Sequence, residues 1–148
     1  LCGISMLAAL EYAHWYTGSR SDGFTYRLPT DLEWEKAARG VDGRTHVWGE
    51  QPVGSFCRSE SSRLRDYLFP ESRGVFPKDE SVYGVRDLAG SVLEPTTSRT
   101  VGGYVSFRGG WYGTADDYLF HASTRFGRPA PKAQYDAGIR LVAEAATE

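Results

Sequence analysis

Residues 41–82 constrain the fold of this chain more than any other stretch. They are rich in glycine, proline, serine, arginine and aspartate, show little periodicity, and carry the turn signals VDGR, PVGS, FPES and FPKDES. We therefore expect a large ordered loop region. A loop region of this length within a compact domain is usually functional, or else aromatic anchors hold it in place. The candidate anchors are Trp48, Phe56, Tyr67, Phe69 and Phe76.

A first helix is predicted near the amino end. Ser5 can cap a helix over about residues 6–16, because its side chain can accept a free amide of the first turn. Leu10 and Ala13 fall on the same face as the first helical residue, and Gly18 follows as a stop. The pattern predicts an amphipathic helix that packs on a core.

A short strand over residues 24–28 and a second helix are predicted next. The strand has a period of two, which places alternate side chains on one face. Thr30 and Glu33 have the spacing of a capping box, so the helix should begin at Asp31 and end at Gly40. Its small apolar face consists of Trp34, Ala37 and Ala38.

The second half of the chain favours short strands. Residues 82–96 alternate around two glycines and predict two short strands joined by a tight turn. Residues 104–113 and 137–144 are also strand-like, and a polar segment with scattered aromatic residues separates them. With two helices, short strands, no internal repeat and no heptads, the expected fold class is α+β.

Composition bounds the function without naming it. The chain has 148 residues, 41% hydrophobic and 14% aromatic, which suffices for one core. Formal net charge is −2, and the 17 basic and 19 acidic residues are interspersed, so nucleic acid is not an expected partner. The longest apolar run is far short of the roughly 20 residues that a membrane span needs.

The ends and the cysteines give weaker bounds. The chain begins at Leu1 rather than methionine, so we expect residues 1–148 to form a single domain at the C-terminal part of a longer protein. Without a visible export signal, cytoplasmic and cell-surface bacterial locations both stay open. Cys2 and Cys57 resemble no zinc spacing; two ordinary buried thiols are expected, and one disulfide is the alternative.

Five separated pieces then match one family in order. They are YRLPTDLEWEKAARG, DGRTHVWGE, SVYGVRDLAGSVLEPT, FRGGWYG and AGIRLV. Together they resemble the sulfatase-modifying, formylglycine-generating enzyme family, a variant of the C-type lectin fold, over about residues 1–142. The resemblance implies two short helices, small antiparallel sheets and long ordered loops.

The resemblance argues against the chemistry of the active oxidase. That enzyme binds copper through two cysteines shortly after the Arg-Gly-Gly motif, and these positions fall at about Thr114 and Leu119. A hydroxyl and an isobutyl group cannot hold Cu(I), which selects soft thiolates. We therefore expect no copper and assign no catalytic residue. A formylglycine-generating-type oxidase that acts on a protein cysteine through an unrecognised site is the alternative.

The family also carries calcium, and the matching residues here are DLAGSVLEP. Asp87 and Glu94 would supply carboxylate oxygens, and Gly90 and Val92 backbone carbonyls, which is the oxygen cage that a hard cation prefers. The alternative is that the two carboxylates brace the turn through hydrogen bonds to backbone amides. Replacements of the family's asparagine and two tryptophans predict different local packing; they are Ser91, Leu93 and Pro95.

The histidines give no metal prediction. Relatives that resemble ergothioneine synthases place iron on histidines of a separate helical domain, which has no counterpart here. His14, His46 and His121 are scattered along the chain. We therefore expect them to be structural or surface groups.

Two non-catalytic groups resemble this chain more closely. One comprises domains attached to bacterial serine/threonine kinases, and a kinase would then lie upstream. The other comprises variable proteins of diversity-generating retroelements, which bind new ligands between the Arg-Gly-Gly motif and the last strand. The expected function is therefore non-catalytic binding of a protein, peptide or glycan, and a structural or sensory kinase appendage is a further alternative.

The expected contact surface lies between Arg108 and Arg140. Aromatic side chains with adaptable polar neighbours are typical of such surfaces. The alternatives are that Trp111 packs in the core, that Arg125 and Arg140 satisfy buried carbonyls or a carboxylate, and that Tyr135 closes the loop. The candidate contact residues are Trp111, Tyr112, Thr114, Asp116, Asp117, Tyr118, Phe120, Arg128, Lys132, Gln134 and Tyr135.

Overall fold

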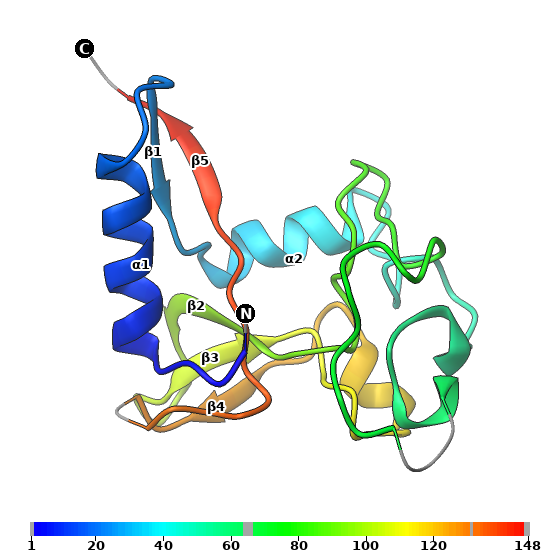
Figure 1. Cartoon of the computed structure of the whole chain (residues 1–148). Coiled ribbons are helices and arrows are strands. Elements are labelled where there is room, and N and C mark those ends of the chain that lie inside the picture. The colour runs from blue at the N-terminus through cyan, green and yellow to red at the C-terminus, as the bar shows by residue number, and fades with distance from the viewer. Residues whose placement is uncertain (1, 64–66, 131, 147–148) are drawn as a thin grey trace.

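The computed structural model describes residues 2–63, 67–130 and 132–146. In chain order its elements are α1 (Met6–Gly18), β1 (Phe24–Arg27), α2 (Asp31–Arg39), η1 (Gly54–Phe56), η2 (Glu60–Ser62), β2 (Glu94–Arg99), β3 (Val105–Arg108), η3 (Asp117–Phe120), β4 (Phe126–Arg128) and β5 (Val142–Ala145), where η marks a short 3-10 helix. The predicted α+β fold is confirmed (Figure 1). Within the described residues, neither α-helix has the length and apolar composition that crossing a bilayer requires.

Two small antiparallel sheets organise the chain. β1 pairs with β5 and joins segments from opposite ends of the sequence, while β2, β3 and β4 form the second sheet in that order. Figure 1 shows α1 beside the first sheet on one side of the molecule and the loop region on the other. The strands predicted in residues 104–113 and 137–144 are confirmed as β3 and β5, whereas β4 was not predicted.

Helix α1 forms as predicted but buries a different face. The Ser5 side chain accepts a hydrogen bond from a first-turn amide, and the helix runs through Gly18 rather than stopping before it. Its buried residues are Ala9 and Ala13, whereas Leu10 is 42% exposed. The prediction of Leu10 in the packed face was wrong, because two alanines one turn apart let the helix approach β1 closely and leave Leu10 on the solvent side.

Helix α2 confirms the local prediction in detail. Thr30 Oγ1 accepts from the Glu33 amide at 3.2 Å, and Glu33 Oε2 accepts from the Thr30 amide at 2.8 Å, which completes the capping box. Such a cap contributes about 1 kcal/mol. Gly40 ends the helix with a φ of 68°, and Trp34 and Ala38 are buried beneath it.

Aromatic residues anchor the loop region only in part. Among its described residues, 41–63 and 67–82, the structure contains no α-helix and no extended strand, as predicted. Trp48 packs against the core, its ring meets the edge of Phe56 at 5.8 Å, and Phe76 is buried. The candidate anchors Tyr67 and Phe69 are 42% and 64% exposed, so these two do not pack into the core.

A buried arginine, rather than the rings of Tyr67 and Phe69, holds this part of the loop region in place. Arg58 is 1% exposed, and its guanidinium donates to the carbonyls of Phe69, at 2.9 Å, and of Tyr67. It also donates to the Ser59 carbonyl. One side chain therefore satisfies several loop carbonyls, which stabilises a segment that has few ladder hydrogen bonds of its own.

Residues 82–96 contain the predicted tight turn but not the two strands. A single bridge between Glu80 and Arg86 closes the turn, and regular pairing begins only at Glu94, the first residue of β2. Asp87 and Ser91 have φ values of 57° and 59°. Residues with left-handed backbone dihedral angles interrupt a strand because these angles lie outside the β region. This segment is therefore irregular.

Among the described residues, two hydrophobic clusters form the core. The first joins α2 to the loops and comprises Trp34, Ala38, Val47, Cys57, Leu88, Ala89, Phe120 and Ala122. The second lies on the three-stranded sheet and comprises Leu93, Val105, Phe107 and Ala137, with Met6, Trp111, Phe126 and Ala130 packed against it. Residues from every third of the chain meet in these clusters, so the irregular segments are held by packing rather than by secondary structure.

Candidate functional site

The structure separates the predicted contact residues into exposed and buried groups. Tyr118 and Tyr135 are 60% and 74% exposed, and Asp116 and Lys132 are exposed as well. Thr114 and Phe120 are buried, so they cannot make the surface contacts predicted for them. The remaining five are half-buried; they are Trp111, Tyr112, Asp117, Arg128 and Gln134.

Trp111 takes the core role that the sequence left open. Its ring meets the edge of Phe126 with 6.2 Å between centroids and packs on the second cluster. Phe120 lies in the first cluster at 2% exposure. Burial of these two apolar rings therefore holds the Arg-Gly-Gly segment against the second cluster and η3 against the first.

Arg128 and Gln134 brace the loop that carries Tyr135. The Arg128 guanidinium makes two hydrogen bonds to the buried carboxylate of Asp136, at 2.7 and 2.8 Å, and a third to Gln134 at 3.1 Å. A bidentate pair of this kind is geometrically demanding and strong. Tyr135 therefore projects from a supported loop and does not close it, since its side chain is largely exposed.

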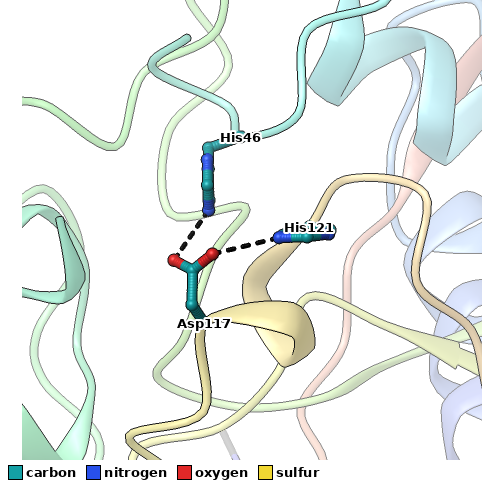
Figure 2. A group of neighbouring side chains, drawn as sticks. All are labelled: His46, Asp117 and His121. Atoms are coloured by element: carbon teal, nitrogen blue, oxygen red, sulfur yellow. Dashed lines mark hydrogen bonds and ion pairs between the residues drawn. The ribbon is translucent and has the colours of Figure 1, made fainter. Parts of the chain in front are cut away.

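Tyr118 and Asp116 belong to a different place, the helical turn η3. The Asp116 side chain accepts from the Tyr118 amide at 3.2 Å and so caps this turn. Beside them lies a cluster that sequence reasoning missed: His46, Asp117 and His121 (Figure 2). The expectation of scattered histidines holds only for His14, which is exposed on α1.

One carboxylate joins the two histidines of this cluster. Asp117 Oδ1 lies 2.9 Å from His46 Nε2, and Asp117 Oδ2 lies 3.0 Å from His121 Nε2. Asp117 and His121 are four residues apart, a spacing that the sequence displays. His46 lies in the loop after α2, 71 residues before Asp117. No local sequence pattern predicts that it meets Asp117.

The residues predicted to hold calcium lie in hydrogen-bonded networks. Glu94 Oε2 accepts from Trp34 Nε1 and from Arg140 Nε, both at 2.7 Å, and the Asp87 side chain accepts from the Gly74 amide at 2.9 Å. Bracing through a backbone amide, the alternative interpretation, describes Asp87. Glu94 instead pairs with the Arg140 guanidinium, and calcium would have to displace that guanidinium. The calcium site with Gly90 and Val92 stays a prediction, which melting curves in calcium and in chelator would test.

Arg140 takes the alternative role that the sequence left open, since it binds backbone carbonyls and a carboxylate. Its guanidinium donates to the carbonyl of Asp87 at 2.8 Å and to that of Arg86 at 3.0 Å, besides pairing with Glu94. These groups line a charged cavity of about 700 Å³ together with Asp79. Arg125 also pairs with a buried carboxylate, that of Asp31 at 3.4 Å, although its own side chain is half exposed.

The buried Asp79 predicts a pH-dependent stability. Burial raises the pKa of Asp79 to about 8, against the opposing effect of the Ala89 amide. An unfolded aspartate titrates at about 4, so between these values only the folded state holds the proton, and rising pH lowers the free energy of unfolding. We expect stability measured by urea titration to fall from about pH 5 to pH 8. Asp79→Asn, which keeps an oxygen acceptor, should flatten the profile; an unchanged slope would contradict the assignment.

The cysteines predict two different reactivities. Both thiols are free; Cys57 is buried, as expected, whereas Cys2 is exposed, which corrects that half of the prediction. Burial raises the pKa of the Cys57 thiol well above its usual range, and only the thiolate reacts readily. An Ellman titration of the native protein should therefore report Cys2 alone, and Cys57 should appear only in denaturant. Cys2→Ser should abolish the native signal.

Comparison with known proteins places this geometry in a family. Residues 1–145 match the family described as sulfatase-modifying factor enzyme 1-like domain. The chain is 30% identical over 138 residues to the inactive C-alpha-formylglycine-generating enzyme 2 of Bos taurus, covering 80% of this chain and 44% of the relative. It is 35% identical over 100 residues to the hercynine oxygenase of Mycobacterium tuberculosis, covering 64% and 21%. The chain thus spans less than half the length of these curated relatives.

Solved structures show the same fold. PvdO from Pseudomonas aeruginosa aligns with a TM-score of 0.78 at 19% identity, covering 97% of this chain and 61% of that one. Variable protein 1 of Treponema denticola aligns with a TM-score of 0.67 at 21% identity, covering 82% and 48%. Likeness at these identities establishes the architecture and leaves the activity open.

Proposed function

Because the chain belongs to the family of sulfatase-modifying factor enzyme 1-like domains, we propose that it is a non-catalytic member that binds a protein, peptide or glycan ligand. The observation that carries this proposal is the chemistry at Thr114 and Leu119, the positions that match the copper cysteines of the oxidase. Thr114 is buried and its hydroxyl accepts from the Asp116 amide at 3.2 Å. Neither side chain offers the soft donor that Cu(I) selects. The name of the bovine relative, an inactive enzyme, supports the same conclusion.

The exposed tyrosines supply the proposed contacts. Tyr118 on η3 and Tyr135 on the loop braced by Arg128 each present a large ring that has few torsions to order on binding. Asp116 and Lys132 add one charge of each sign beside them. We therefore propose two contact patches, one at Asp116 and Tyr118 and the other at Lys132 and Tyr135.

A binding screen with paired variants tests the proposal. Wild-type protein is screened on a glycan array and against a displayed random-peptide library, and the strongest binder is measured by interferometry. We expect Tyr118→Ala or Tyr135→Ala to weaken it at least about tenfold, the equivalent of 1.4 kcal/mol. The matched control is Tyr83→Ala, which removes a tyrosine that is 52% exposed outside both patches. Melting temperatures should stay unchanged in all three variants.

Two results would overturn the proposal. One is the lack of any binder in both screens, or a binder that Tyr83→Ala weakens as much as the patch variants do. The other is catalysis: oxygen uptake with a cysteine-containing peptide after incubation with copper would restore the oxidase alternative. A kinase in the same chain stays a separate prediction, and its activity with and without residues 1–148 would test it.

A further inference from the structure

We propose that His46, Asp117 and His121 bind a divalent transition-metal ion, with Zn²⁺ as the best match. Two imidazole nitrogens and a carboxylate oxygen are the donor set of many zinc sites that retain an open position. All three ligand atoms lie within 4.8 Å of one another. The site adjoins the proposed contact patch at Asp116 and Tyr118, since the Tyr118 ring lies 5.4 Å from that of His121. Its test does not depend on that patch, because ion binding can be measured without any other ligand.

The spacing of the ligand atoms suits a metal ion. Zinc bonds to nitrogen and oxygen at about 2.0–2.2 Å, so tetrahedral geometry separates neighbouring ligand atoms by about 3.3 Å. The two hydrogen bonds in the cluster already place nitrogen and oxygen 2.9 and 3.0 Å apart. The two nitrogens contact different oxygens of the Asp117 carboxylate. An ion bound by one of these oxygens therefore needs a small rotation of the Asp117 side chain, besides an opening of a few tenths of an ångström in the pair that it bridges. Figure 2 shows both Nε2 atoms directed at the same carboxylate.

The scaffold holds the two histidines in place before any ion arrives. His46 lies in a turn closed by two backbone hydrogen bonds with Gly49, at 2.8 and 3.1 Å, and its ring stacks on Trp48 at 5.0 Å. The Ala122 amide donates to the Thr45 carbonyl at 2.8 Å. Since these two residues adjoin His121 and His46 in sequence, this bond ties the two ligand segments together. Preorganised ligands lose little entropy when they bind an ion.

One residue of the cluster is buried, and the other two reach solvent. His46 is 1% exposed, whereas the side chains of Asp117 and His121 are 39% and 26% exposed. An ion can therefore enter from solvent and keep water on its open side. Within the described residues, the buried Nδ1 of His46 has no hydrogen-bond partner, so Nε2 makes the ring's polar contact.

The donor set also predicts which ions bind. Imidazole suits zinc, copper, nickel and cobalt, whereas calcium and magnesium prefer cages made entirely of oxygen. The affinity of the site for the ion should increase from Co²⁺ to Cu²⁺, in the usual order for nitrogen and oxygen ligands. The site should therefore discriminate sharply between Zn²⁺ and Ca²⁺, which separates it from the calcium prediction at Asp87 and Glu94.

Calorimetric titration of untagged, chelator-treated protein with ZnCl₂ tests the proposal. We expect about one equivalent to bind, Co²⁺ to give the visible absorption bands of a low-symmetry site, and Ca²⁺ to give no heat above dilution. His121→Ala and Asp117→Asn should weaken zinc binding at least 10–100-fold, roughly the loss seen when a ligand loses only its outer-shell partner. Neither variant empties a buried position, so both should fold.

The third histidine provides the matched control. His14→Ala removes an exposed imidazole from α1, outside the cluster, and should leave the affinity for zinc unchanged. The proposal is overturned if wild-type protein binds no zinc, if His121→Ala binds as tightly as wild type, or if His14→Ala loses binding equally. One equivalent of zinc should broaden or shift the NMR resonances of His46 and His121. A response of the His14 resonances instead would also overturn the proposal.

Discussion

Replacing Glu94 with alanine is expected to lower the free energy of unfolding by about 3–5 kcal/mol, the usual cost of breaking a buried ion pair. Glu94 is 6% exposed and accepts hydrogen bonds from Trp34 and Arg140. Without it, the indole N–H has no acceptor and the guanidinium loses its counter-ion. Because these contacts join α2, β2 and the segment before β5, the loss should destabilise the whole domain. Urea titration measures the change directly.

Glu144→Ala provides the control for this prediction. Glu144 forms the same kind of pair, with Arg27 at 3.0 Å, but the two side chains are 62% and 36% exposed. Solvent-exposed pairs contribute about 0–1 kcal/mol, so the control should be nearly neutral. Equal losses in the two variants would contradict a special role for Glu94. Arg140→Ala, which leaves the Glu94 carboxylate buried without its cation, should resemble Glu94→Ala.

Gly90→Ala is expected to cost about 2–5 kcal/mol, the sum of about 1–2 kcal/mol for a left-handed alanine and about 1–3 kcal/mol for overpacking. Gly90 has a φ of +67°, and an added Cβ would lie 2.1 Å from the Arg58 carbonyl oxygen. The Ser91 amide donates to that same carbonyl at 2.8 Å. Because Arg58 holds the carbonyls of the loop region, the substitution should also loosen that region. Faster proteolysis within residues 59–76 would report this second effect.

Gly103→Ala separates the two contributions. Gly103 has a φ of +76°, close to that of Gly90, but an added Cβ meets nothing within 4 Å. The control should therefore show only the backbone cost of about 1–2 kcal/mol. A Gly90 variant no less stable than the Gly103 variant would mean that the Arg58 segment moves aside freely, contrary to its buried hydrogen bonds.

The residues that stabilise the fold differ from the residues that are proposed to bind a ligand or a metal ion. Glu94, Arg140, Arg58 and Gly90 hold irregular backbone in place where few ladder hydrogen bonds exist. The proposed ligand patches and the proposed metal site lie on segments that this framework supports. Changes at Tyr118 or His121 should therefore alter binding with little loss of stability, whereas changes at Glu94 or Gly90 should do the reverse.

Local features of the sequence predicted the local structure well. The capping box of Thr30 and Glu33, the stop at Gly40 and the strand before the Arg-Gly-Gly motif all formed as expected. Each depends on residues a few positions apart, so the sequence displays the complete interaction. The strands predicted in residues 82–96 failed because backbone with positive φ at Asp87 and Ser91 is rare for these residues and depends on their surroundings.

The sequence by itself determined the family, the fold class, the two helices and the absence of cysteine from positions 114 and 119, because motif order, capping and residue identity can all be read along the chain. Only the tertiary structure decided which candidate residues are exposed, that Arg58 holds the loops, and that His46 meets Asp117 and His121. Those outcomes depend on contacts between residues that are far apart in the sequence, such as Arg58 with Tyr67, 9 positions away, and His46 with Asp117, 71 positions away. Burial and packing, rather than local preference, bring such residues together.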